Sequence, residues 1–247
     1  MSFSCGLLSR VRTARPRLPG PAGRPSPARL RVARPAGQSL AGLATALTVL
    51  LWIEVALGIA CAGALINRIS VAGDLLHGDF LGFLERVRSA DNAVGAAYSC
   101  FVLVGLAIAV LLIIWMWRVA KNAELTGCTQ PRFSPGWTIG GWFIPLANLV
   151  IPVLIVQDLW RASEPGAPQG DPTWRRRSGS ALVGWWWATH VASYLLVLRG
   201  SGSNLEELRT ADTVACLGAV TATAAAILLV QVVRRITSRQ QLALGRA

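Results

Sequence analysis

Two ionisable side chains lie inside apolar stretches of this sequence, and they are the first places where chemistry could occur. Glu54 falls near the middle of an apolar run over 40–66, and His190 falls within another run over 181–198. A charge at the centre of a membrane helix costs roughly 2.5–3.5 kcal/mol on insertion scales, so a carboxyl group there indicates a proton or cation site or a contact between helices. A protonated carboxyl bonded to a neighbour is the alternative for Glu54, and an ordinary packing residue is the alternative for His190. We predict the two as a candidate polar pair across a helix bundle.

No other pattern in the chain predicts catalysis. Phosphate-binding loops, zinc-protease signatures and serine nucleophile elbows are absent from the sequence. The five cysteines show no spacing typical of a metal site. We therefore predict a protein that is not an enzyme, with no catalytic residue, no metal and no cofactor.

The composition indicates the elements that carry these residues. Of 247 residues, 53% are hydrophobic and 15% are charged, which is far less charge than soluble domains carry. A net charge of +12 would suggest nucleic acid in a soluble chain, but basic residues between apolar runs are topology signals in a membrane protein. We predict an all-α integral membrane protein in the plasma membrane, with multiple spans and no nucleic-acid partner.

The chain divides into three parts. Residues 1–38 form an Arg/Pro-rich leader without acidic residues, which we expect to be disordered and cytoplasmic unless translation starts downstream of it. Residues 39–239 form the membrane domain, and 240–247 form a cytoplasmic tail. Helices of about 20 apolar residues cross a bilayer, and four uninterrupted runs in this domain are predicted to do so: 40–66, 94–117, 181–198 and 213–233.

A fifth apolar segment, residues 137–160, is interrupted. Pro145 and Pro152 remove backbone donors, and Gly140 and Gly141 adjoin each other in the same stretch. If this segment crosses the membrane, the basic residues divide 13 to 11 between the two sides; if it does not, they divide 19 to 5. The second division is the one that the positive-inside rule expects. We therefore predict four spans, a re-entrant or interfacial segment, both termini in the cytoplasm, and a basic loop over 161–180 that contacts anionic lipid headgroups.

The interrupted segment and its flanks also carry a recognisable motif. It reads RVAxNAE over 118–124, SPGWxIGGWFIPxxNxxxP over 134–152 and DLWRAS over 158–163. This motif resembles that of an actinobacterial membrane-protein family catalogued as domain of unknown function 4328, over about 40–239. The resemblance implies a multi-pass plasma-membrane protein and implies no activity. The signature residues are Trp137, Gly140, Gly141, Trp142, Pro145, Asn148, Pro152, Asp158, Trp160 and Arg161.

Three classes of function are compatible with these features. The first is a non-enzymatic scaffold or regulatory module that uses the interrupted segment and the basic cytoplasmic face, with a homo-oligomer or a membrane protein as partner. The second is a small oligomeric channel or transporter that uses Glu54, and the third, an intramembrane enzyme, is disfavoured. Arg118, Asn122 and Glu124 complete the candidate polar residues, with headgroup contact or pairing at the cytoplasmic face as their expected role.

Overall fold

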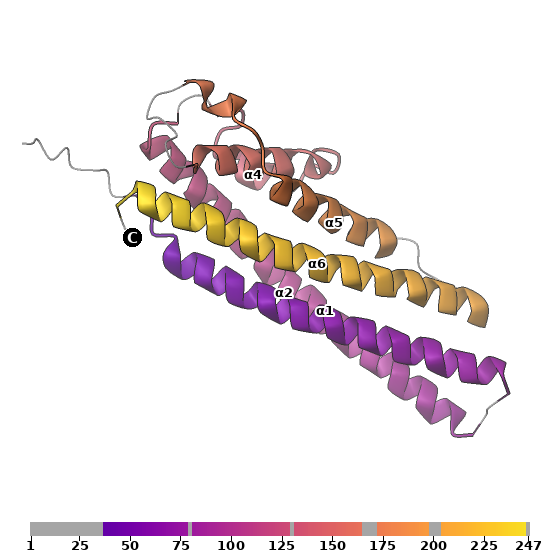
Figure 1. Ribbon diagram of the computed structural model, residues 1–247. Coiled ribbons are helices and arrows are strands. Elements are labelled where there is room, and N and C mark those ends of the chain that lie inside the picture. Colours follow the sequence, from indigo (N-terminus) through magenta and orange to yellow (C-terminus); the bar gives the residue numbers. More distant parts are fainter. Residues whose placement is uncertain (1–36, 79–80, 129–130, 165–171, 198–203, 246–247) are drawn as a thin grey trace, which may run out of the picture. The chain divides into compact units, whose positions relative to one another are not determined.

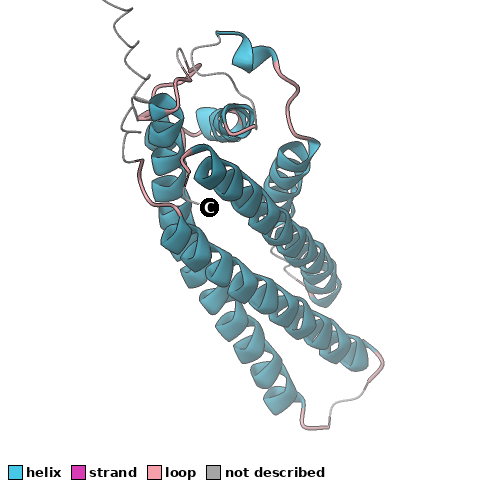
Figure 2. Ribbon diagram, turned by 60° about the vertical axis from the view of Figure 1, so that its left-hand side comes forward, coloured by secondary structure: helices cyan, strands magenta, loops and turns pink. Residues whose placement is uncertain are grey.

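The computed structural model describes residues 37–78, 81–128, 131–164, 172–197 and 204–245, all within the unit Pro35–Ala247. Most of the predicted leader, 1–36, lies outside the described residues. Every regular element in the described part is helical, which confirms the all-α prediction (Figures 1 and 2). The elements are α1 (Ala41–Leu76), α2 (Phe83–Leu125), α3 (Trp137–Gly140), the 3₁₀ helix η1 (Ala147–Leu149), α4 (Ile151–Ala162), the 3₁₀ helix η2 (Pro172–Arg176), α5 (Ala181–Val197) and α6 (Leu205–Ala243).

Three of these helices, α1, α2 and α6, are long and apolar enough to span a membrane. Each continues well past its apolar run: α2 has 43 residues, which is about 65 Å at 1.5 Å per residue. The hydrocarbon core of a bilayer is only about 30 Å thick, so the polar ends of such a helix project beyond it. The fourth predicted run lies in α5, of which 17 helical residues are described.

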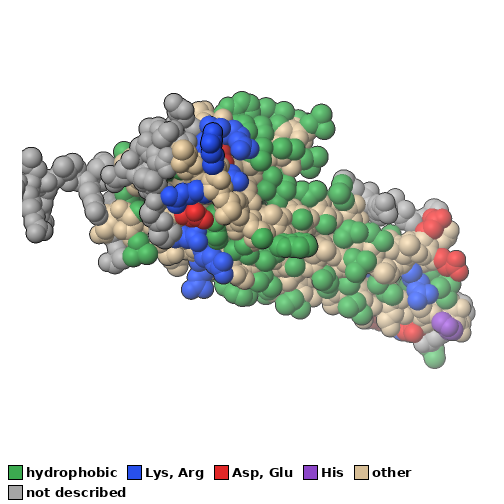
Figure 3. Space-filling view, turned by 45° about the horizontal axis from the view of Figure 1, so that its top comes forward, with side chains coloured by type: hydrophobic (Ala, Val, Ile, Leu, Met, Phe, Trp, Pro, Cys, Tyr) green, Lys and Arg blue, Asp and Glu red, His purple; other side chains and the backbone are tan. Residues whose placement is uncertain are grey.

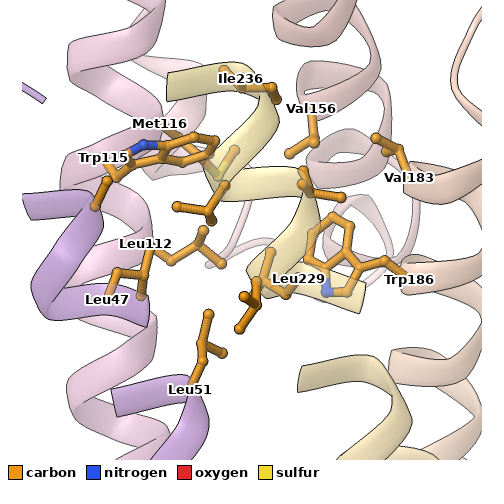
Figure 4. Close-up of a cluster of buried hydrophobic side chains, with 14 of the residues drawn as sticks. Leu47, Leu51, Leu112, Trp115, Met116, Val156, Val183, Trp186, Leu229 and Ile236 are labelled. Carbon is orange, nitrogen blue, oxygen red and sulfur yellow. The ribbon is translucent and has the colours of Figure 1, made fainter. Parts of the chain in front are cut away.

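The helices α1, α2, α5 and α6 pack in the order α2, α1, α6, α5. α1 packs against both α2 and α6, α6 packs against α5, and α2 and α5 are not a packed pair among the described residues. Figure 1 shows the same arrangement, and Figure 4 shows where the helices meet in a buried apolar core to which α4 also contributes, with Val156 labelled. The labelled core residues are Leu47, Leu51, Leu112, Trp115, Met116, Val156, Val183, Trp186, Leu229 and Ile236.

Polar contacts define the two ends of this bundle. At one end, here called the Asn122 end, Asn122 of α2 bonds the backbone of Gln38 just before α1, and Gln240 of α6 donates to the backbone oxygen of Val119 at 3.1 Å. At the other, the Arg68 end, Arg68 of α1 donates through Nε to Asp212 of α6 at 2.8 Å. Gly218, in the first half of α6, lies beside Leu196 and Val197 at the end of α5. Neighbouring helices in the packing order therefore run in opposite directions.

The interrupted segment consists of α3, η1 and α4, which confirms the break that its prolines and glycines predict. Pro152 lies in the first turn of α4, where a missing backbone donor costs nothing. At the N-terminal side of α4, the indole nitrogen of Trp187 in α5 donates to the Leu149 oxygen at 2.9 Å. Further along α4, Gln157 exchanges two hydrogen bonds with the backbone of Ser180, at 2.8 and 2.7 Å. α4 therefore runs antiparallel to the first turns of α5.

Both flanks of the segment lie at the Asn122 end. On the C-terminal flank, Arg239 of α6 lies over the ring of Trp160, with 4.3 Å from Cζ to the ring centroid. On the N-terminal flank, Phe133 lines a small cavity together with Ala123 of α2 and Ala162 of α4. The chain thus leaves the bundle end and rejoins it on the same side.

Charge is distributed unequally between the two ends (Figure 3). Lys and Arg side chains gather at the Asn122 end, and a stretch with mainly hydrophobic and tan surface separates them from the Arg68 end, where acidic and basic side chains both occur. The basic residues on the elements that meet at the Asn122 end are Arg118, Lys121, Arg132, Arg161, Arg175, Arg176, Arg177, Arg234, Arg235 and Arg239.

Candidate functional site

The candidate site is a cavity of about 800 Å³ between α2 and α5, which we call the α2–α5 groove. Because these two helices do not pack against each other, α1 and α6 form its floor. It runs from Arg68 and Asp212 at one end to Trp142, Asn148 and Leu149 of the interrupted segment at the other. Its volume lies within the range typical of small-molecule sites, roughly 300–1,000 Å³.

The groove is hollow because the helices present small side chains to it. On α6 the lining includes Ala215, Ala219 and Ala222, and on α2 it includes Gly105 and Ala109. A packed protein interior holds few voids larger than a water molecule, so this is a local departure from close packing. The lined part of α6 extends from residue 208 to residue 229, a rise of about 30 Å at 1.5 Å per residue, which equals the thickness of the hydrocarbon core.

Glu54 lies on the floor of the groove. Its side chain is only 8% exposed and sits against α2, where a Cβ added to Gly105 would come 3.3 Å from Glu54 Oε1. The other carboxyl oxygen, Oε2, is buried and has no hydrogen-bond partner among the described residues. Burying a polar atom without a hydrogen-bond partner lowers the stability of a protein. The middle of the groove therefore holds a carboxyl oxygen that lacks a hydrogen-bond donor.

Two further unpartnered polar atoms lie where the interrupted segment meets the groove. The indole nitrogen of Trp142 and Oδ1 of Asn148 are both buried, and neither has a partner in the described part of the chain. Trp187 lies near both residues: its ring centroid is 6.1 Å from that of Trp142, and its nitrogen donates to the backbone oxygen of Leu149, which follows Asn148. A donor and an acceptor, both enclosed by protein atoms, are therefore left without partners at this end.

His190 belongs to an aromatic cluster on α5. Its ring centroid lies 6.1 Å from that of Trp186, 5.3 Å from Trp187 and 4.9 Å from Tyr194. His190 and Glu54 both line the groove, so the structure brings the predicted pair to one site. No hydrogen bond or ion pair between them is present in the described structure, and the histidine packs mainly against aromatic rings.

The other predicted polar residues hold the Asn122 end together. Asn122 is fully buried, accepting from the Gln38 nitrogen at 2.7 Å and donating to the Gln38 oxygen at 3.0 Å. Arg118 donates to the Ser39 oxygen at 3.1 Å, and Glu124 accepts from Lys121 at 3.0 Å. Asn122 and Arg118 therefore anchor the chain entering α1, whereas Glu124 pairs within α2, and all three lie outside the groove lining.

The signature residues divide between the groove and the bundle end. Trp142 and Asn148 face the groove, whereas Asp158 pairs with Arg161 at 2.9 Å and with Arg132 at 3.8 Å. Among the remaining members, Gly141 is buried, Pro145 and Trp137 are exposed, and Trp160 receives Arg239.

Sequence reasoning did not identify the lining of the groove. The alanines of α6 and Gly105 were not assigned to a site, because small residues four apart are equally typical of close helix packing. The only sequence signal for Trp187 was its place in the Trp185–Trp186–Trp187 run.

Comparisons with known proteins add a family and no activity. No curated protein and no solved structure matches the chain. The match to a family begins at residue 82, so α1 and Glu54 lie outside it, and the matched part is shorter than the 40–239 that the motif suggested. Since the matched region covers more than half of the chain, this protein belongs to the family described as "Domain of unknown function (DUF4328)", which matches residues 82–238.

Proposed function

We propose that the protein crosses the plasma membrane four times, through α1, α2, α5 and α6, with both termini in the cytoplasm. The antiparallel order of these helices supports this topology, and the 17 described residues of α5 are at the short end of what spans a bilayer. The interrupted segment then enters from the cytoplasmic side and returns to it. The gathering of Lys and Arg at the Asn122 end fits a cytoplasmic face that contacts anionic headgroups.

Cysteine accessibility in intact cells tests this topology. Cysteines placed at the exposed positions Ser134, Ser178 and Leu242 are expected to react with a membrane-impermeant maleimide only after permeabilisation. Cysteines at the exposed positions Leu81 and Glu206 are expected to react in intact cells. Labelling of positions 134 and 178 from opposite sides would mean that the interrupted segment crosses the membrane.

We propose further that the protein is a non-enzymatic membrane module that binds an amphiphilic lipid in the α2–α5 groove. One observation carries this proposal: the lining of an apolar cavity of about 800 Å³ includes Glu54, Trp142 and Asn148, each of which has a buried polar atom that the described residues leave without a partner. In a bilayer the open side between α2 and α5 faces lipid, so an acyl chain can enter sideways. Because Trp142 and Asn148 belong to the interrupted segment, a lipid bound in the groove would affect this segment at the cytoplasmic face.

Filling the groove tests the proposal. The full-length protein in nanodiscs is irradiated with a phospholipid that carries a diazirine in its acyl chain, and the labelled peptides are mapped. Ala222→Phe, which adds a ring to the groove lining, is expected to reduce labelling of α2 and α5 groove peptides by roughly tenfold, because a packed interior has no room for both occupants. Val220→Phe places the same ring on an exposed position of the same helix and is expected to change little. Equal labelling of the two variants would exclude a lipid in the groove.

The buried carboxyl of Glu54 specifically supports one alternative, a small oligomeric channel or transporter. Intramembrane carboxylates are usual in proton and cation pathways. Glu54→Gln in reconstituted vesicles distinguishes transport from lipid binding. A proton or cation flux that the unchanged protein supports and this variant abolishes would favour transport. The same flux in both proteins, with lipid labelling retained in the variant, would favour the binding module.

A further inference from the structure

We propose that the amphiphile taken up by the groove carries a positively charged ammonium head, and that the carboxylate of Glu54 is its counter-ion. This inference rests on the proposed lipid-binding function and specifies the charge of the ligand. The ligand class is a long-chain ammonium ion, with its head at Glu54 and its apolar chain along the groove.

The charges of the lining favour a cation. The charged side chains among the described lining residues are Glu54, Arg68 and Asp212, which is one guanidinium group against two carboxyl groups. Arg68 is already paired, because it donates to Asp212 at 2.8 Å and lies 3.4 Å from Asp91. It is also fourteen residues beyond Glu54 on α1, a rise of about 21 Å. The described lining therefore offers no free cation to an anionic head and one unpaired carboxyl group to a cationic head.

Glu54 can receive such a head. No hydrogen bond or ion pair joins it to another described residue, and only one of its carboxyl oxygens, Oε2, is fully enclosed. The other oxygen, Oε1, lies beside Gly105 of α2, which lines the groove and has no side chain to cover it. A buried carboxyl group without a partner is most stable when it is protonated, whereas an ammonium ion that replaces this proton leaves a neutral pair. Glu54 can therefore bind a cation without leaving a net charge inside the membrane.

Aromatic rings line the groove on both walls. The lining includes Tyr98 and Phe101 of α2 and His190 and Tyr194 of α5. Tyr194 is 61% exposed, its ring centroid lies 4.9 Å from that of His190, and it is close enough to Glu54 for the two groups to interact electrostatically. The face of an aromatic ring attracts a cation within about 6 Å, and proteins use such rings to bind quaternary ammonium groups. Aromatic walls beside an unpaired carboxyl group therefore fit an ammonium head.

Space for the apolar chain lies between Glu54 and Arg68. Over this stretch the lining includes Leu65 of α1 and the small side chains Ala219 and Ala215 of α6. An alkyl chain that starts at Glu54 can therefore lie along these side chains toward the Arg68 end.

The test uses two photoactivatable amphiphiles with identical diazirine-bearing alkyl chains, applied to the full-length protein in phosphatidylcholine nanodiscs. One ends in a trimethylammonium group, and the other ends in the uncharged isostere in which carbon replaces nitrogen. Labelling is counted on the α2 and α5 groove peptides, which do not contain Glu54. Glu54→Gln is expected to reduce labelling by the cation at least about tenfold, because the buried ammonium group loses its counter-ion. The same variant is expected to change labelling by the isostere little.

Two further variants control for the effect of the charge. Glu54→Asp keeps a carboxylate at the same position and is expected to retain most of the labelling by the cation. Glu124→Gln removes a carboxylate from α2 outside the groove lining, and it is expected to leave labelling by both probes unchanged.

The outcomes separate the ligand class from the function. Labelling by the cation that Glu54→Gln leaves unchanged would overturn the ammonium inference. Equal loss of both probes in Glu54→Gln and in Glu54→Asp would also overturn it, since the effect would then be independent of charge. In either case, labelling of the unchanged protein that Ala222→Phe blocks would leave the lipid-binding function standing. Labelling of the groove by neither probe in the unchanged protein would overturn both proposals.

Discussion

The adjacent glycines of the interrupted segment give a sharp test of its packing. Neither Gly140 nor Gly141 has a positive φ, so neither position needs glycine for its backbone conformation. Their surroundings differ completely. A Cβ at Gly141 would lie 2.6 Å from Ile151 Cγ2 and 3.0 Å from the Trp137 oxygen, whereas a Cβ at Gly140 would have no neighbour within 4 Å.

We expect Gly141→Ala to destabilise the protein and Gly140→Ala to leave it nearly unchanged. Favourable carbon–carbon contacts lie at about 3.5–4.0 Å, so the new methyl group must displace Ile151 at the start of α4 or the backbone of α3. Overpacking of this kind costs about 1–3 kcal/mol, which is roughly 4–8 °C in Tm for a change near 2 kcal/mol in a chain of this length. At Gly140 the lower flexibility of alanine in the unfolded chain contributes about 0.4–1 kcal/mol in the stabilising direction.

Thermal unfolding of both variants in detergent micelles, together with photolabelling of the groove in nanodiscs, measures the difference. Because Trp142 follows Gly141 directly, displacement of this turn is also expected to weaken lipid labelling in Gly141→Ala. Equal Tm values for the two variants, or a larger loss in Gly140→Ala, would refute the packing described for this turn.

Further predictions concern the two bundle ends. Asn122→Ala is expected to lower the free energy of unfolding by about 2–4 kcal/mol, since both backbone groups of Gln38 lose their partner; unchanged thermal unfolding would contradict this. Arg68→Met is expected to cost about 3–5 kcal/mol because it leaves the Asp212 carboxylate, 4% exposed, without its cation, and adding Asp212→Asn should restore part of the loss in the same assay. Burial raises the pKa of the Cys128 thiol, so the folded state keeps its proton to a higher pH than an unfolded thiol does. Its maleimide reaction is therefore expected to be slow at pH 8 and to accelerate above pH 9, whereas detergent-denatured protein should react readily at pH 8; a fast reaction of the folded protein at pH 8 would oppose this.

Several features of the fold were predictable from the sequence because they depend on local chemistry. Uninterrupted apolar runs can satisfy their backbone groups in a membrane only as helices, and the described part of each predicted run lies in a helix, apart from Leu40 just before α1. Pro145 and Pro152 cannot both sit inside one regular helix, which explains the break between α3 and α4. The helix ends were less predictable: α1 and α2 continue far beyond their apolar runs because the paired charges Asp74 and Arg86 are accommodated on helical turns.

The candidate site was only partly predictable. Glu54 was recognisable because an isolated carboxyl in an apolar run is unusual, and Asn148 and Trp142 were recognisable as parts of a motif. Nothing in their spacing indicated that all three would line one cavity, because they lie on different elements whose packing order decides their distance. Asn122 was grouped with the functional polar residues, and the structure shows it bonded at both groups to the chain that enters α1.

The sequence by itself determined that this protein is helical, where its apolar runs lie, that one of them is broken, and to which family it belongs. Only the tertiary structure decided what the small residues do. Gly58 of α1 meets Thr223 of α6 at close range, so there a missing side chain allows two helices to touch. Ala222, one residue earlier on α6, lines the groove, so there a small side chain leaves a hollow. The same residue types give opposite results because the outcome depends on whether a neighbouring helix packs on that face, and none of the described helices fills the space between α2 and α5.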